Sequence, residues 1–209
     1  MNDPAHPIVY IVDDDRSVRS SVARLLESSG FEVRTFASAT DYLDEVDADR
    51  HGCLLLDLRM PGIDGLELQD RLLQGGRARP IIFLTGQGTV PASVAAMKAG
   101  ATDFLEKPAD PRELVRAVRS ALAADRRRRR ESAEMAEIES RVLLLTPRER
   151  QVFERVVQGR LNKQIARELG VSEKTVKVHR GRVMEKMQTD SLADLARLAE
   201  RLGIGETPV

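Results

Sequence analysis

The chain has 209 residues, of which 42% are hydrophobic and 32% are charged, and its formal net charge is zero. This length predicts one domain of ordinary size and a second, smaller one. Residues 1–125 hold 14 basic and 20 acidic side chains, whereas residues 126–209 hold 19 and 13, so the two halves are expected to bind different partners. The single cysteine excludes an intramolecular disulfide, and the lack of a long apolar run excludes a membrane span and predicts a cytoplasmic protein.

The first half alternates short apolar runs with segments of helical spacing. The apolar runs and one segment that alternates, residues 32–36, are predicted as strands, and a helix is predicted after each. The predicted strands are 8–12, 32–36, 53–57, 81–85 and 103–106. Short connections between such elements require right-handed crossovers, so the expected fold is α/β, with a parallel sheet covered by helices on both faces.

Polar side chains stand at the ends of four of these strands. They are Asp13, Asp14, Asp57, Thr85 and Lys107. The carboxyl ends of parallel strands share one edge of the sheet, where these side chains converge if the strand order reverses between the first and third strands. Carboxylates with open coordination suit Mg²⁺, and a free carboxylate can form an acyl phosphate. Asp57 is the predicted phosphoacceptor, with Lys107 and Thr85 stabilising the charge of the phosphoryl group.

Each of these residues also has an ordinary structural interpretation. The segment 13–15 is compatible with a solvated loop that caps a helix, and for Asp15 capping is the preferred interpretation. Thr85 is compatible with an ordinary strand end, and Lys107 with a surface lysine. Coincidence at four separate strand ends is a poor explanation, so the functional interpretation is favoured.

Four segments carry a resemblance to the receiver domain of two-component response regulators, over about residues 6–124. These segments are 11–15, 56–65, 83–86 and 103–108. The resemblance implies a flavodoxin-like fold, with a five-stranded parallel sheet of order 2-1-3-4-5. It also implies that a sensor histidine kinase phosphorylates Asp57.

The same resemblance implies a metal site and a switch. The Mg²⁺ ligands would be Asp14, Asp57 and the backbone carbonyl of Arg59, with Asp13 acting through water. Thr85 and Phe104 would form the switch pair, in which the hydroxyl turns toward the phosphoryl group and the ring follows. Ala109 stands where this subfamily often has an aromatic residue, so the surface beside the fifth helix is expected to differ.

A connector, predicted as 125–141, follows this domain. No glycine or proline interrupts residues 112–146, and apolar residues recur at steps of three and four. Three interpretations stay open: a solvated or flexible linker, a dimerising coiled coil, and a segment in which Arg126 to Arg130 contact DNA phosphates. The coiled coil is limited by a polar middle, since it needs about three to four apolar heptads.

After the connector, capping residues and helical spacing predict three helices over residues 146–187. Thr146 and Glu149 indicate a capping box, Asn162 is expected to cap the next helix, and Ser172 the third. The second and third helices form a helix-turn-helix over about Asn162 to Gly181, whose second helix would lie in the DNA major groove. The predicted DNA contacts are Lys174, Thr175, Lys177, Val178, Arg180, Gly181 and Arg182. Val176, Val183 and Met187 are expected to face the core.

The alternative for this half is a helical hairpin with a solvated basic face. Segments 145–150, 162–166 and 171–179 resemble the LuxR-type output domain. The resemblance covers about residues 142–205 and implies an all-α domain of four helices, the fourth over 192–202. With the receiver, the chain is similar to the FixJ/NarL group of regulators. The resemblance implies a transcriptional regulator that is switched by aspartyl phosphorylation. It would act as a homodimer on promoter DNA, with RNA polymerase as a candidate partner and no membrane contact.

Two alternative functions remain. One is a DNA-binding regulator that does not depend on phosphorylation and whose acidic pocket is vestigial. The other is a Mg²⁺-dependent aspartyl phosphatase. The phosphatase is disfavoured because the position two residues after Asp57, where such an enzyme places its acid/base, is Arg59. The chain is therefore predicted not to be an enzyme.

Overall fold

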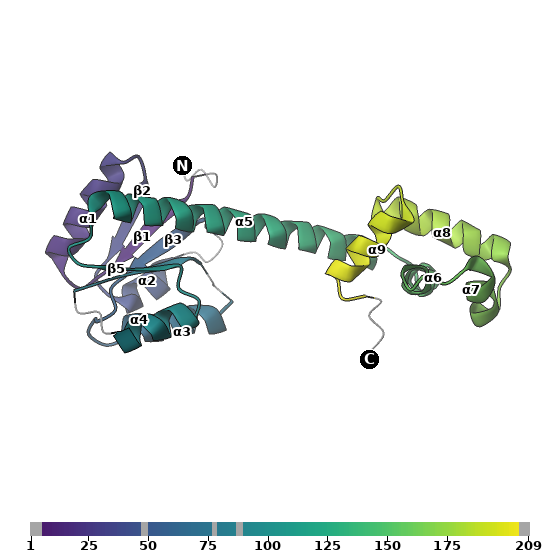
Figure 1. Cartoon of the computed structure of the whole chain (residues 1–209), viewed down its shortest axis with the longest axis horizontal. Coiled ribbons are helices and arrows are strands. Elements are labelled where there is room, and N and C mark those ends of the chain that lie inside the picture. The colour runs from purple at the N-terminus through teal and green to yellow at the C-terminus, as the bar shows by residue number, and fades with distance from the viewer. Residues whose placement is uncertain (1–5, 47–49, 77–78, 87–89, 205–209) are drawn as a thin grey trace. The chain divides into compact units, whose positions relative to one another are not determined.

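In the computed structural model the chain forms two compact units, which divide between Arg128 and Arg129. The structure describes residues 6–46, 50–76, 79–86 and 90–204. The first unit contains a sheet with helices on both faces, and the described part of the second contains helices joined by turns and no strand (Figure 1). Each unit has its own hydrophobic core.

The first unit is built on a five-stranded parallel sheet, with the order β2-β1-β3-β4-β5. The strands are β1 (Ile8–Val12), β2 (Glu32–Phe36), β3 (Gly52–Leu56), β4 (Ile81–Thr85) and β5 (Asp103–Glu106). The predicted order is confirmed. The third strand starts and ends one residue earlier than predicted, so Asp57 lies just beyond it, although its amide still donates to the Val12 carbonyl over 2.8 Å.

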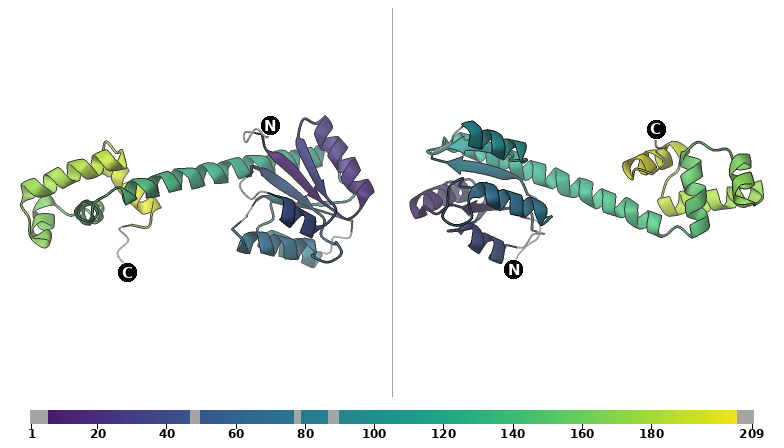
Figure 2. Two further views of the ribbon diagram at one scale, coloured as in Figure 1. Left: turned by 180° about the vertical axis from the view of Figure 1, so that it is seen from behind. Right: turned by 90° about the horizontal axis from the view of Figure 1, so that it is seen from below.

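Helices cover the two faces of this sheet as two layers. They are α1 (Arg16–Ser28), α2 (Ala39–Glu45), α3 (Gly65–Gln74), α4 (Val90–Lys98) and the first part of α5 (Pro111–Leu143). Helices α1 and α5 lie on one face, and α2, α3 and α4 lie on the other (Figures 1 and 2). Because β1, β3 and β4 are central and covered twice, every residue in them is buried.

At the amino-terminal edge of the sheet, α5 is fixed to β3 by a buried carboxylate. Asp125 accepts a hydrogen bond from the Gly52 amide over 3.1 Å, and its side chain is 2% exposed. His51 Nδ1 lies 3.5 Å from Asp125 Oδ2, and Arg128 Nη2 lies 2.9 Å from Oδ1. Glycine is required at position 52, since a Cβ there would lie 2.1 Å from the Ile8 carbonyl oxygen.

Helix α5 is continuous over 33 residues, and its apolar positions serve the cores of the two units. Leu114, Ala117 and Ala121 are buried in the first core, and Ile138 and Val142 in the second. The apolar ends of the predicted coiled-coil seam are therefore already used. Only the polar middle of the seam is left for contact with a second α5 helix. Dimerisation through this middle part stays a prediction.

The second unit packs four further helices against the end of α5. These are α6 (Pro147–Val157), α7 (Asn162–Leu169), α8 (Glu173–Met187) and α9 (Leu192–Arg201). The predicted capping box of Thr146 and Glu149 is confirmed, as is the Ser172 cap of α8. The prediction that Asn162 caps α7 was wrong: Asn162 is the first residue of the helix, and the Gln164 side chain accepts from the Leu161 amide instead.

Candidate functional site

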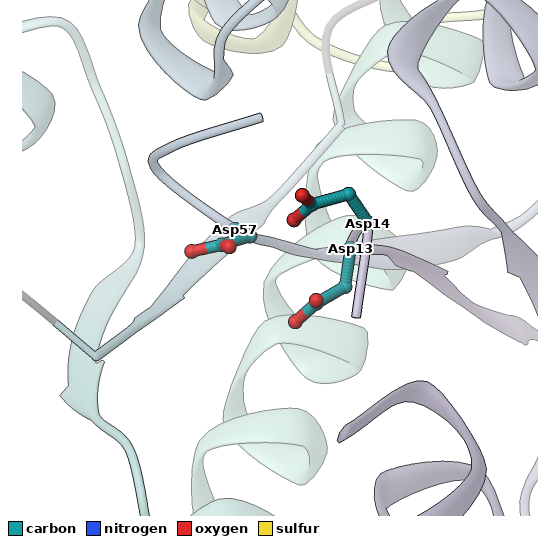
Figure 3. A group of neighbouring side chains, drawn as sticks. All are labelled: Asp13, Asp14 and Asp57. Atoms are coloured by element: carbon teal, nitrogen blue, oxygen red, sulfur yellow. The ribbon is translucent and has the colours of Figure 1, made fainter. Parts of the chain in front are cut away.

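Three carboxylates meet at the carboxyl-terminal edge of the sheet. Asp13 and Asp14 directly follow β1, and Asp57 directly follows β3. A ligand oxygen from each lies within 4.8 Å of the other two. Figure 3 shows the three side chains turned toward the same side of the strand ends. The convergence follows from the parallel sheet, in which β1 and β3 are neighbours.

Lys107, just after β5, contacts two of these carboxylates. Its Nζ lies 2.6 Å from Asp13 Oδ2 and 3.1 Å from Asp57 Oδ2. Three carboxylates and one ammonium group leave a formal charge of −2. An oxygen-rich group of this charge fits a divalent cation such as Mg²⁺, which prefers carboxylate ligands and retains waters for its other positions.

The environment shifts the pKa values of Asp57 and Lys107. Burial raises the pKa of Asp57, an effect that the charge of Lys107 opposes and that of Asp13 reinforces. Burial alone would lower the pKa of Lys107, but its contacts with Asp13 and Asp57 outweigh this, so the pKa of the ammonium group is raised. Lys107 therefore stays charged, and can neutralise anionic oxygens that approach Asp57.

Two neighbouring loops are held by local capping bonds. Asp15 caps α1 by accepting from the amides of Ser17 and Val18, which confirms its interpretation as a cap. Asp64 caps α3, and Gly65 comes next, where a Cβ would lie 2.4 Å from the Asp57 carbonyl oxygen. The loop after Asp57 can approach this closely only because residue 65 is glycine.

The predicted switch residues lie on neighbouring strands. The Thr85 side chain is buried at the end of β4, and the Thr85 backbone carbonyl accepts a hydrogen bond from the Lys107 amide over 2.8 Å. Phe104 on β5 pairs in register with Phe83, and the two ring centroids are 6.2 Å apart. Since Thr85 is two residues after Phe83, the hydroxyl and both rings lie on one face of the sheet.

In the second unit, α8 has one buried and one exposed face. Val176, Val183 and Met187 are buried in the core, as predicted. The predicted DNA-contact residues Lys174, Lys177, Val178, Gly181 and Arg182 are exposed. Val178 is 50% exposed among basic side chains, which is compatible with apolar contact to a thymine methyl group.

The other two predicted DNA contacts are partly buried and already have partners. The Thr175 hydroxyl lies 2.8 Å from the Ser172 hydroxyl, and its amide donates to the same oxygen. Arg180 Nη1 donates to Asn162 Oδ1 over 2.6 Å. Asn162 was not among the predicted contacts, because nothing in the sequence pairs residues on different helices.

Comparison with known families decides what these two sites belong to. Residues 9–119 match the response regulator receiver domain, and residues 143–199 match the bacterial regulatory proteins of the luxR family. The chain belongs to the response regulators. More narrowly, it combines a receiver with a LuxR-type DNA-binding domain, as the FixJ proteins do, and the predicted family is confirmed.

Several relatives of this response regulator match it over nearly its whole length. It is 47% identical to Nodulation protein W of Bradyrhizobium diazoefficiens, covering 94% of this chain and 87% of the relative. It is also 47% identical to the transcriptional regulatory protein FixJ of Azorhizobium caulinodans, covering 94% of this chain and 93% of the relative. The solved structure of the response regulator StyR is 45% identical, covers 94% of this chain and 100% of its own, and superposes with a TM-score of 0.84.

These likenesses establish the general function: the response regulator is a DNA-binding regulator of transcription whose receiver controls it. Within its described part, no helix has the length and apolar character to cross a membrane. Two features escaped sequence reasoning, the Asp125 anchor of α5 and the bond between Arg180 and Asn162. Both join residues that are far apart in the chain, 73 and 18 positions respectively.

Proposed function

We propose that Asp57 accepts a phosphoryl group from the phosphohistidine of a sensor kinase, and that this event increases DNA binding by α8 as a homodimer. The proposal is supported chiefly by one observation: the Asp57 carboxylate lies at a strand end beside two further carboxylates and the Lys107 ammonium group. This arrangement supplies a nucleophile, a cation site and a fixed positive charge within one small volume.

The reaction itself requires little of the protein beyond positioning. An Asp57 oxygen bonds to phosphorus while the bond from phosphorus to the histidine nitrogen breaks, and that nitrogen keeps the electron pair. Lys107 neutralises one non-bridging oxygen, and the Thr85 hydroxyl donates to another. The Arg59 amide hydrogen-bonds to the Asp57 carboxylate and orients it.

Mg²⁺ fits the three carboxylates, and the Arg59 carbonyl would add a further oxygen ligand. When bound, the ion would neutralise charge on the phosphoryl oxygens. The protein holds the carboxylates in place through the strand ends and the capped loops.

Phosphorylation would reach the surface of the receiver through Thr85 and Phe104. When the Thr85 hydroxyl turns toward the phosphoryl group, space would open beside Phe83, and the Phe104 ring, whose centroid lies 6.2 Å from that of Phe83, would move into it. The altered surface would favour pairing of two chains, so that two α8 helices meet two DNA half-sites. RNA polymerase is a candidate partner at the promoter.

Intact-protein mass spectrometry tests the proposal. With Mg²⁺ and a small phosphodonor, the full chain should gain about 80 Da, the mass of one phosphoryl group. The gain should vanish in Asp57→Asn and in EDTA, yet persist in Asp64→Asn, a control at an exposed cap nearby. The phosphorylated chain should also bind promoter DNA more tightly.

The two alternative functions give different results in this experiment. A chain that binds its promoter equally well without any mass gain would be a regulator with a vestigial pocket. Many turnovers of a phosphoester per chain would identify a phosphatase. Either result would overturn the proposed switch.

A further inference from the structure

The hydrogen bond between Arg180 and Asn162 joins the two helices of the helix-turn-helix. Arg180 lies on α8 and Asn162 at the start of α7, and their side chains meet at 2.6 Å, where both are partly buried. A charged donor and an amide oxygen at this distance form a strong bond. It limits the places that the guanidinium group can occupy.

The chemistry of the two groups determines which way the Asn162 amide faces. A guanidinium group only donates hydrogen bonds, so the Asn162 carbonyl oxygen must face it and the NH₂ group must point elsewhere. The described part of the chain contains no hydrogen bond from that NH₂ group. Arg180 donates one hydrogen bond to Asn162, and its other N–H groups can donate to a further acceptor.

Arg180 lies at the edge of the exposed face of α8. It is four residues after the buried Val176 and three after the exposed Lys177, so it lies on the flank of the helix. A helix in the major groove has the DNA backbone along its flanks, and side chains there meet phosphates rather than base edges. This places Arg180 among the groups that would contact phosphates.

We propose that Asn162 is a positioning residue for DNA binding, which holds the Arg180 guanidinium group ready to contact a backbone phosphate. The inference rests on the proposed DNA-binding role of α8. Asn162 acts through Arg180: it restricts the long side chain before DNA arrives, which lowers the entropy cost of ordering it in the complex.

A double-mutant cycle on the full chain tests this inference, with fluorescence anisotropy on a random-sequence duplex. Such DNA suffices because phosphate contacts do not depend on sequence. Asn162→Ala should weaken binding about 3- to 10-fold, the range expected when one ordered side chain is released. Arg180→Ala should weaken it at least as much and lower the salt slope by about 0.9 for each lost contact.

The decisive result is the coupling between the two substitutions. In the Arg180→Ala background, Asn162→Ala should have no further effect on affinity. Arg182, an exposed arginine on the same helix, provides the matched control. In the double variant of Asn162 and Arg182, the fold-losses of affinity caused by Asn162→Ala and by Arg182→Ala should multiply.

Three results would overturn the inference. One is an equal effect of Asn162→Ala with and without Arg180. Another is a loss of unfolding free energy in Asn162→Ala that matches its loss of DNA affinity, which would make Asn162 a merely structural residue. The unfolding is followed by the NMR signal of the buried Met187 methyl group. The third is a wild-type chain that binds no duplex, specific or random, which would overturn the DNA-binding function as well.

Discussion

Replacing Glu149 by glutamine removes one charge from the second unit and changes its shape very little. Glu149 Oε2 accepts from Lys186 Nζ over 2.6 Å and from the Thr146 amide over 2.9 Å, and the residue is 2% exposed. Lys186 also donates to the Leu144 carbonyl. The carboxylate therefore ties the start of α6 to the end of α8, the helix proposed to read DNA.

The size of the effect follows from the pKa of Glu149. The bond from Lys186, opposed by burial and aided by the Thr146 amide, lowers this pKa from 4.5 to about 2. At about 1.4 kcal/mol per unit the upper limit is about 3 kcal/mol, and because the Lys186 side chain is 32% exposed, screening reduces it to about 2 kcal/mol. A lowered pKa stabilises the fold above the unfolded value of 4.5, and this stability is lost as the pH falls toward 2.

The expected result is that Glu149→Gln lowers the free energy of unfolding by about 2 kcal/mol at pH 7, and by less than half of this at pH 3. Urea unfolding of the full chain, followed by the NMR signal of the buried Met187 methyl group, measures this free energy. Met60, buried in the first unit, is the internal reference and should not change. Glu154→Gln, in an exposed pair on the same helix, should cost less than about 0.5 kcal/mol. Equal losses at pH 3 and pH 7 would refute the electrostatic argument.

Two further predictions concern the sites themselves. Gly65→Ala places a Cβ 2.4 Å from the Asp57 carbonyl oxygen, so it should destabilise the receiver by about 1 to 3 kcal/mol and slow its phosphorylation, whereas Gly86→Ala, which meets only open space, should do neither. Urea unfolding and the rate of phosphodonor labelling check this, and equal behaviour of the two variants would contradict it. Lys177→Ala should weaken binding to promoter DNA more than binding to unrelated DNA, with Lys98→Ala on the receiver as control. Equal losses on the two DNAs, measured by anisotropy, would indicate a phosphate contact instead.

The strands and the acidic site could be predicted from the sequence because both depend on local patterns. Three apolar runs and two short segments of mixed polarity became the five strands, four of them with the predicted bounds. A parallel sheet then brings every strand end to one edge, so Asp13, Asp57 and Lys107 had to be neighbours once the order of the strands was known. The departure at β3 is small: Asp57 still pairs through its amide but lies outside the strand.

The long-range polar contacts could not be predicted. Helical spacing shows which face of a helix is buried, but not which side chain on another helix it meets. Asn162 was therefore predicted as a cap, the ordinary role of asparagine at such a position, whereas in the structure it binds Arg180. The spacing in α5 was ambiguous for a related reason, since steps of three and four describe a coiled coil and also two stripes that serve separate cores, as the buried ends of this helix do.

The contacts of Lys107 suggest why phosphorylation should act through Thr85. A phosphoryl group adds about two negative charges and three acceptor oxygens to a site whose ammonium group is already shared by Asp13 and Asp57. The new oxygens must draw donors from groups near at hand, and the Lys107 amide already joins the end of β5 to the Thr85 carbonyl. The Thr85 side chain is buried at the end of β4, on the face of the sheet that also holds Phe83 and Phe104. In the proposed switch, a turn of the Thr85 hydroxyl toward the phosphoryl group would open space beside these rings, so that a change in charge would become a change in packing.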